Sequence, residues 1–290
     1  MKNKITIPLT VPKNKQQIYK ENYLKATLNS QNLFLFAGDQ KIEHLNKDFY
    51  GPDISEESSD PKHLFEIASK AKIGAFATQL GLITRYASDY PNINYIIKIN
   101  SKTNIVPASQ NDPKSFSLLK PKKVVEAIKE SNLNAVGLGY TIYLGSEYEA
   151  EMFNEASKVI YYAHQNGLLA ILWMYPRGEA VTNEQDADII AGAAGVGACL
   201  GADFVKINVP KNKTGELDPN LLKQAVLAAG RTKVICSGGK KIKEEDFLKQ
   251  VSEQINIGGT NGVAVGRNIH QKSLTEAISF CQKLSEIIIK

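Results

Sequence analysis

Eight short apolar segments recur along the 290 residues and alternate with longer amphipathic stretches. Each apolar segment has the length of a buried strand, and the stretches between them carry helical periodicity. This alternation is typical of parallel βαβ units, because two parallel strands need a crossover connection and a helix usually supplies it. The strands are expected at residues 33–37, 73–77, 95–99, 134–138, 169–174, 203–207, 233–236 and 262–265.

Capping signals mark the starts of two of the helices between these strands. Ser146 and Glu149 have the spacing of a capping box, and so do Ser273 and Glu276. Eight strands with helices between them predict a closed (β/α)8 TIM barrel, which is α/β in class and forms a single domain at about this chain length.

The expected division of the chain is an N-terminal extension over residues 1–30, packed on a barrel domain over residues 31–290. The connection after the first strand runs from Asp39 to about Lys70, which is long for a loop between a strand and a helix. We expect this connection to cover part of the barrel mouth.

An open, doubly wound sheet is the competing architecture. Its dinucleotide-binding fingerprint is a glycine-rich turn between a strand and a helix. The glycines that come nearest to this pattern, Gly192, Gly195 and Gly197, lie inside an expected helix, where close helix packing explains them. The pattern therefore favours the barrel.

The composition excludes several classes of protein. Hydrophobic residues make up 43% of the chain, and the net charge of +5 comes from basic residues scattered among acidic ones. Nucleic-acid binding is therefore not expected. The first 30 residues lack the apolar stretch of a signal peptide or a membrane span, so we expect a soluble, cytoplasmic protein.

The three cysteines carry no metal-binding pattern. Cys199, Cys236 and Cys281 occur in apolar settings without the CxxC or histidine spacing of a zinc site. We expect reduced thiols in the core, no disulfide framework and no bound metal.

Three expected strands end in ionisable residues. Lys206 lies inside the apolar sixth segment, and burial there favours the neutral amine that attacks carbonyl groups. Asp39 follows the first strand and Tyr175 follows the fifth. Strand ends of this kind meet at the mouth of a barrel, so these three residues are the candidate catalytic set. A structural explanation stays open for Lys206, since a strand lysine also reaches solvent or pairs with a carboxylate.

The last two strands carry a second signal. Barrels of this type frequently bind phosphate after strands seven and eight, where backbone N–H groups are available. Glycine lets the backbone approach a phosphate, and an arginine adds charge or a bidentate contact. The residues at these two positions are Ser237, Gly238, Gly239, Gly266 and Arg267.

Three further residues near the expected mouth have undecided roles. Arg177 lies in a Tyr-Pro-Arg-Gly turn and is either a second phosphate ligand or a surface arginine. His44 either moves protons or holds the long first connection in place. Lys98, at the end of the third strand, either lines the pocket or forms an ion pair with Asp39.

Segments spread over most of the chain resemble the archaeal-type class I fructose-bisphosphate aldolases, a family that also occurs in bacteria and is related to the deoxyribose-phosphate aldolases. Their order and their strand positions agree with that family. The matching segments are DQKIEH at 39–44, GYTIYLGSE at 139–147, LWMYPRG at 172–178, GADFVK at 201–206, SGG at 237–239 and GVAVGR at 262–267.

The resemblance implies reversible cleavage of fructose 1,6-bisphosphate to dihydroxyacetone phosphate and glyceraldehyde 3-phosphate, without a cofactor. It implies Lys206 as the Schiff-base residue, Tyr175 as the proton-transfer residue and Asp39 as the group that orients the amine and the intermediate. Trp173 matches a family tryptophan near the substrate, although the core of the barrel explains it equally well. The family's habit further implies a homo-oligomer.

One departure from the family leaves the substrate open. Many archaeal members carry Asp-His-Gly where this chain has Asp39-Gln40-Lys41. The alternatives are a related lysine-dependent aldolase, transaldolase-type or thiolase-type enzyme for another phosphorylated ketose or diketone, an isomerase with Asp39 as its base, and a phosphometabolite-binding barrel without activity. A metal-dependent aldolase needs a zinc-binding cluster of histidines, and the spacing of the four histidines does not predict one.

Overall fold

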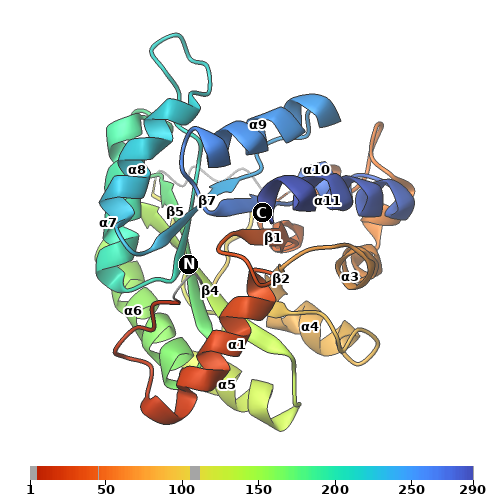
Figure 1. Ribbon diagram of the computed structural model, residues 1–290, viewed down its shortest axis with the longest axis vertical. Helices are drawn as coiled ribbons and strands as arrows, with labels where there is room; N and C mark the ends of the chain where they lie inside the picture. The colour runs from red at the N-terminus through yellow and green to blue at the C-terminus, as the bar shows by residue number, and fades with distance from the viewer. Residues whose placement is uncertain (1–4, 45, 105–111, 290) are drawn as a thin grey trace.

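The computed structural model of the protein describes residues 5–44, 46–104 and 112–289 and contains a closed barrel of eight parallel strands (Figure 1). Each strand pairs with the next one in the sequence, and the last pairs with the first. This confirms the predicted barrel and excludes the open sheet. The strands are β1 (Leu33–Ala37), β2 (Ala75–Gln79), β3 (Tyr95–Lys98), β4 (Ala135–Leu144), β5 (Leu169–Pro176), β6 (Phe204–Ile207), β7 (Lys233–Ser237) and β8 (Gly262–Val265).

Helices ring the barrel, with α7 and α8 on one side of Figure 1 and α3 and α4 on the other. Short 3₁₀ turns lie at residues 13–15, 46–48, 56–59 and 219–221. The α-helices are α1 (Gln16–Ala26), α2 (Gln40–Glu43), α3 (Pro61–Lys70), α4 (Leu80–Tyr86), α5 (Pro121–Glu130), α6 (Glu149–Gln165), α7 (Ala187–Leu200), α8 (Leu222–Ala229), α9 (Glu244–Asn256), α10 (Arg267–His270) and α11 (Leu274–Ile288).

The sequence patterns predicted most of these elements correctly, but they predicted some of the element ends wrongly. Ser273 forms the predicted capping box with Glu276 at the start of α11. Ser146 does not, because α6 begins at Glu149 with Tyr148 as its N-cap, and the Ser146 hydroxyl accepts from the Tyr148 N–H instead. Strand β2 begins two residues later than predicted, and β4 is longer because it pairs with β5 as far as residue 144.

Helix α1 packs against the N-terminal end of the barrel, on the face nearest the viewer in Figure 1. The Tyr19 hydroxyl donates to the Asp203 carboxylate just before β6, and the Tyr23 ring stacks on Phe204 with centroids 5.8 Å apart. The aromatic face of α1 therefore covers this end of the barrel, and the carboxyl ends of the strands form the opposite end.

Alternation along the strands decides which side chains enter the barrel. On β5, Ile171 and Trp173 join the core inside the barrel, whereas Leu172 and Met174 pack outward under the helices. On β6, Phe204 points inward, so Lys206 two residues later points inward as well. The same period of two directs the side chains at the strand ends towards the mouth.

Gly262, at the start of β8, provides a test of this packing. Its φ is +121°, and an added Cβ would lie 2.0 Å from the Leu33 carbonyl oxygen. Gly262→Ala is expected to lower the free energy of unfolding by about 3 kcal/mol or more, from backbone strain and the clash. Gly192→Ala is the matched control: it lies in α7 with open space around it and is expected to raise stability by about 0.5–1 kcal/mol. Denaturant unfolding of both variants measures these changes, and an unchanged midpoint for Gly262→Ala would contradict the close approach.

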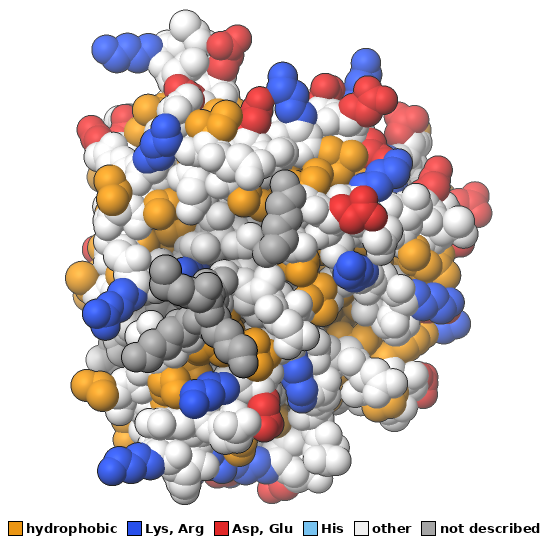
Figure 2. Space-filling model, viewed as in Figure 1, with side chains coloured by type: hydrophobic (Ala, Val, Ile, Leu, Met, Phe, Trp, Pro, Cys, Tyr) orange, Lys and Arg blue, Asp and Glu red, His pale blue; other side chains and the backbone are white. Residues whose placement is uncertain are grey.

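The surface agrees with the charge distribution expected from the sequence. Basic and acidic side chains are interspersed on the face shown in Figure 2. In the described part of the chain, no helix combines the length and apolar character needed to cross a membrane. All three cysteines are free thiols, as predicted, but Cys199 is exposed on α7, so its predicted place in the core is wrong. The reason is that its position on α7 faces away from the barrel.

Candidate active site

A cleft opens at the carboxyl ends of the strands. Its walls carry charged and titratable side chains of both signs, which suits an anionic substrate with a reactive carbonyl group. These side chains are Asp39, Glu43, His44, Arg177, Lys206 and Arg267.

The three predicted catalytic residues all line this cleft. Lys206 on β6 pairs in register with Trp173 on β5. Tyr175 lies two residues after Trp173, so it faces the same side of β5 and is nearer the mouth of the barrel. The Lys206 Nζ lies 5.8 Å from the centroid of the Tyr175 ring. Asp39 reaches the cleft from the end of β1, where it is nearly fully buried.

The surroundings of Lys206 favour its neutral amine. Burial lowers the pKa of Lys206, and the Arg267 charge lowers it further, while Asp39 and Glu43 act in the opposite direction. Desolvation is the largest of these effects. Among the described residues, Lys206 has no carboxylate in ion-pair contact. Its amine therefore faces the cleft without a salt bridge that would hold it protonated.

Tyr175 is held in the protonated form. Burial raises the pKa of its phenol, and the negative charges of Asp39 and Glu43 raise it further, against the opposing effects of Lys98 and Arg177. A phenol in this state donates a proton and regains it within one reaction cycle. It therefore suits proton transfer to a substrate carbon that develops negative charge.

A second buried lysine lies close to the first, and its contacts differ. The Lys98 Nζ is 3.0 Å from Glu43 Oε1 and 3.6 Å from Asp39 Oδ2. Both lysines lie over the Trp173 ring, with Nζ to centroid distances of 5.1 Å for Lys98 and 5.4 Å for Lys206. Only Lys206 lines the cleft. The interpretation of Lys98 as an ion-pair partner of Asp39 is thus confirmed.

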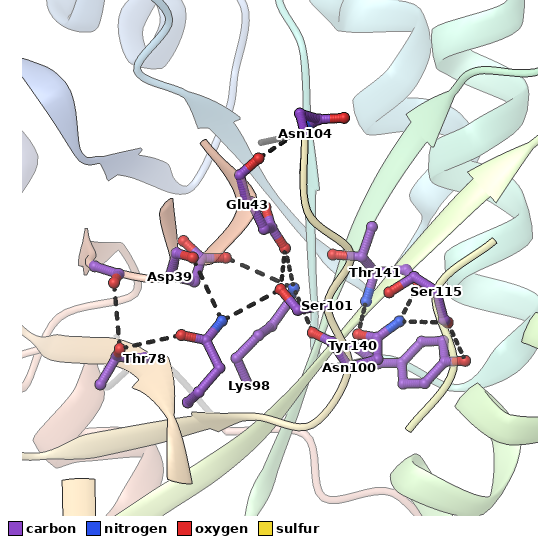
Figure 3. A network of polar contacts seen from close by, with 12 residues as sticks. Asp39, Glu43, Thr78, Lys98, Asn100, Ser101, Asn104, Ser115, Tyr140 and Thr141 are labelled. Carbon is purple, nitrogen blue, oxygen red and sulfur yellow. Dashed lines mark hydrogen bonds and ion pairs between the residues drawn. The ribbon is translucent and has the colours of Figure 1, made fainter. Parts of the chain in front are cut away.

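A polar network surrounds Lys98 behind the cleft wall (Figure 3). Ser101 donates to the same Glu43 oxygen that Lys98 contacts, and the Asn104 amide donates to the Glu43 backbone oxygen. The Gln79 amide reaches the Asp39 carbonyl oxygen at 3.4 Å. These contacts fix the segment after β1 against the ends of β2 and β3.

The predicted phosphate segments after β7 and β8 also line the cleft. The Gly238 N–H is taken by the Ala264 carbonyl oxygen and is not available to a ligand. The Gly239 N–H has no hydrogen-bond partner among the described residues, and its φ of +65° is one that glycine adopts readily. The Ser237 hydroxyl donates to Asn208 Oδ1, which shares the cleft wall.

The remaining predicted ligands differ from expectation. Arg177 lines the cleft, but its guanidinium is already bound by both oxygens of Glu184, at 2.8 and 2.9 Å. Trp173 is completely buried and does not line the cleft, because β5 places it one layer below the mouth. An added Cβ on Gly139 would lie 2.6 Å from its ring, so β4 leaves room for the indole. The structure therefore favours the core explanation for Trp173.

The long first connection covers part of the mouth, as expected. His44 Nδ1 pairs with Asp48 Oδ2, and the same carboxylate oxygen lies 3.8 Å from the Arg267 guanidinium. Asp48 is therefore a counter-ion for the predicted phosphate arginine. In the described ranges, no group of three or more histidine, cysteine or acidic side chains is arranged to hold a metal ion.

The cleft residues that the sequence prediction missed include Asn104, Tyr143 and Asn208. Asn208 lies two residues after Lys206, so strand alternation alone would have identified it. Tyr143 is on β4, whose pairing with β3 is irregular between Tyr95 and Ile96. Because this irregularity shifts which β4 residues face inward, the position of Tyr143 was not predictable from a simple count.

Comparison with known proteins agrees with this geometry. The model of the DeoC/LacD family aldolases matches residues 33–272. The chain is 56% identical over 289 residues to the fructose-bisphosphate aldolase/6-deoxy-5-ketofructose 1-phosphate synthase of Methanocaldococcus jannaschii, with 100% of this chain and 92% of the relative covered.

Two solved structures are also similar. A fructose-bisphosphate aldolase from Slackia heliotrinireducens has a TM-score of 0.95 and 48% identity, covering 100% of this chain and 91% of that one. An archaeal fructose-1,6-bisphosphate aldolase, whose catalytic lysine is covalently bound to the carbinolamine intermediate of the substrate, has a TM-score of 0.79 and 33% identity over 94% of this chain and 100% of that one. The chain therefore belongs to the DeoC/LacD family of aldolases, and within it to the archaeal-type class I fructose-bisphosphate aldolases.

Proposed function

We propose that this aldolase cleaves fructose 1,6-bisphosphate reversibly through an imine on Lys206. The observation that carries the assignment is the contrast between the two buried lysines. Lys98 is paired with two carboxylates behind the cleft wall, whereas Lys206 faces the cleft and its pKa is lowered by burial. Lys206 is therefore the lysine able to attack a bound carbonyl group.

The first half of the reaction forms the imine. The neutral Lys206 amine attacks the C2 carbonyl carbon, and loss of water from the carbinolamine gives a protonated imine. The C4 hydroxyl then gives its proton to water, the bond between C3 and C4 breaks, and the electron pair of that bond moves into the imine to give an enamine. Glyceraldehyde 3-phosphate leaves at this step.

The second half returns a proton to carbon. Tyr175 donates its phenolic proton to C3 of the enamine, which restores the imine, and hydrolysis releases dihydroxyacetone phosphate and the Lys206 amine. Synthesis runs the same steps backwards, with Tyr175 removing the C3 proton. Asp39 orients the amine and supplies negative charge beside the cationic imine.

Borohydride trapping tests this proposal. The protein is incubated with dihydroxyacetone phosphate and sodium borohydride, with and without EDTA, and peptide mass spectrometry locates the reduced adduct. We expect an adduct on Lys206 that EDTA does not diminish. Binding of the ketone phosphate without any adduct would overturn the covalent mechanism and favour an isomerase or a binding protein.

The state of Arg177 favours a second activity at the same site. Retro-aldol cleavage of 6-deoxy-5-ketofructose 1-phosphate between C3 and C4 gives dihydroxyacetone phosphate and methylglyoxal, an aldehyde without phosphate. Because Glu184 neutralises Arg177, the aldehyde end of the cleft is not committed to a second phosphate. We therefore propose that the enzyme also joins dihydroxyacetone phosphate to methylglyoxal, as the name of the Methanocaldococcus relative indicates for that protein.

Two arginine variants separate these activities. Arg267→Met removes the cation at the ketone-phosphate end, so kcat/KM is expected to fall about 10- to 100-fold with either aldehyde, the scale of a charged hydrogen bond. Arg177→Met is expected to lower kcat/KM to this extent for fructose 1,6-bisphosphate only. Steady-state assays with both substrate pairs measure the difference. Equal losses of kcat/KM with both substrates in Arg177→Met would show that Arg177 does not bind the second phosphate.

Two wider expectations stay predictions. A homo-oligomer follows from the family resemblance, and analytical ultracentrifugation would measure its size. A cytoplasmic location likewise follows from the expected sugar-phosphate substrate.

A further inference from the structure

Lys98 is the most completely buried cation near the cleft. Its side chain has no solvent exposure, and its ammonium contacts Glu43 Oε1 at 3.0 Å, the Asn100 carbonyl oxygen at 3.3 Å and Asp39 Oδ2 at 3.6 Å. Burial of an ammonium is costly, so a lysine at such a place needs partners that offset its lost hydration. Figure 3 shows these partners converging on Lys98 from the segment after β1 and from the end of β3.

The two carboxylates around Lys98 are held differently. Glu43 Oε1 accepts from both Lys98 and Ser101. Asp39 Oδ2 is buried and accepts no hydrogen bond from any described residue. For this oxygen, the Lys98 ammonium is therefore the stabilising charge in closest contact.

The charges of this cluster do not cancel. One ammonium and two carboxylates carry a net charge of −1. Both carboxylates line the cleft, and Asp39 is the more deeply buried of the two. The excess negative charge lies where Lys206 becomes a cationic imine, because both Asp39 and Glu43 act on the Lys206 amine electrostatically. A fixed negative charge at this position stabilises the imine as it forms.

We propose that Lys98 is a positioning residue for the aldol reaction, which holds the Asp39 carboxylate in place beside Lys206 while Glu43 and Ser101 hold Lys98 and the segment after β1 together. This inference rests on the proposed function, because it assigns Lys98 to the same site. Lys98 itself touches neither substrate nor the cleft, and it acts through Asp39.

A split between kcat and KM reports this role. Loss of the Lys98 cation leaves Asp39 Oδ2 without its nearest charged partner, so the carboxylate beside Lys206 is no longer held in place. Other charged or titratable groups also act on this part of the cleft and stay in place in the test. They are Tyr143, Tyr175, Arg177, Lys206 and Arg267.

Lys98→Met keeps the length of the side chain and removes its charge. The value of kcat is expected to fall about 10- to 100-fold, the scale of a lost charged hydrogen bond. KM is expected to change little, because Lys98 does not line the cleft. Borohydride trapping on Lys206 is expected to persist.

Glu43→Gln provides the opposite case. Removing an anion beside Asp39 leaves Lys98 to pair with Asp39 alone, so kcat is expected to fall less than in Lys98→Met. The double variant Lys98→Met/Glu43→Gln removes both charges, and its kcat is expected to lie below that of Glu43→Gln. This comparison keeps the test decisive if Lys98→Met alone does not fold.

Lys233→Met, at the opposite end of the barrel on β7, is the matched control and is expected to keep the parent kcat and KM. A lowered melting temperature with an unchanged kcat, in Lys98→Met and in the double variant relative to Glu43→Gln, would reduce Lys98 to a structural residue and overturn the inference. Absence of the Lys206 adduct in the parent protein would instead overturn the proposed function, so the two failures are distinguishable.

Discussion

Replacing Lys206 with methionine is expected to abolish aldol cleavage, with a loss in kcat on the order of 10⁶-fold, the scale seen when a covalent nucleophile is removed. Methionine keeps the length of the side chain but offers no amine for the imine. Binding of dihydroxyacetone phosphate is expected to persist, because the predicted phosphate-binding segments after β7 and β8 are unchanged. A coupled assay measures turnover, and isothermal titration calorimetry measures binding.

The same substitution is expected to raise stability, which distinguishes lost chemistry from lost folding. Burial lowers the pKa of Lys206 below its ordinary value of 10.5, so the folded protein binds fewer protons than the unfolded chain between these two values. The stability of the parent therefore rises with pH across this window. The advantage of Lys206→Met is full below the lowered pKa and shrinks as the pH approaches 10.5.

Lys233→Met serves as the control for removing a lysine from a barrel strand and is expected to keep full turnover. Residual activity of Lys206→Met within about 100-fold of the parent would be incompatible with an essential imine, given the size of covalent catalysis. The isomerase interpretation, with Asp39 as the base, would then become the leading one.

Replacing Tyr175 with phenylalanine is expected to lower kcat by about 10²- to 10⁴-fold, the usual contribution of a general acid. The imine is still expected to form, because Lys206 is unchanged, so borohydride trapping persists. Exchange of the C3 proton of dihydroxyacetone phosphate with solvent is expected to be lost. NMR spectroscopy in deuterated water measures this exchange directly.

Tyr143→Phe is a closely matched control, since Tyr143 also lines the cleft and burial also raises the pKa of its phenol. We expect Tyr143→Phe to keep proton exchange at C3. If exchange were lost in Tyr143→Phe and kept in Tyr175→Phe, the proton-transfer role would belong to Tyr143.

The two tyrosines also show how far sequence patterns reach. Tyr175 was predicted because it ends an apolar segment and an unbroken alternation on β5 directs it inward. Tyr143 was not, because the irregular pairing of β3 with β4 changes the register along β4. A local pattern therefore predicts side-chain direction only where the strand is regular.

The pairing of charges was decided by the tertiary structure. Lys98 and Glu43 are 55 residues apart, and nothing in either segment specifies that they meet. Arg177 and Glu184 are only seven residues apart, yet their contact depends on the path of the loop between them. Both pairings bear on the proposed function of the cleft. The Lys98 cluster is proposed to hold Asp39 in place, and Glu184 neutralises Arg177.

The sequence by itself determined the barrel and the inward positions of Asp39, Tyr175 and Lys206, because apolar runs and a period of two are local properties of a chain. Only the tertiary structure decided that Lys98 is paired while Lys206 is not, and that Trp173 lies below the cleft. Those outcomes depend on which distant groups share a desolvated space, and no local pattern encodes that.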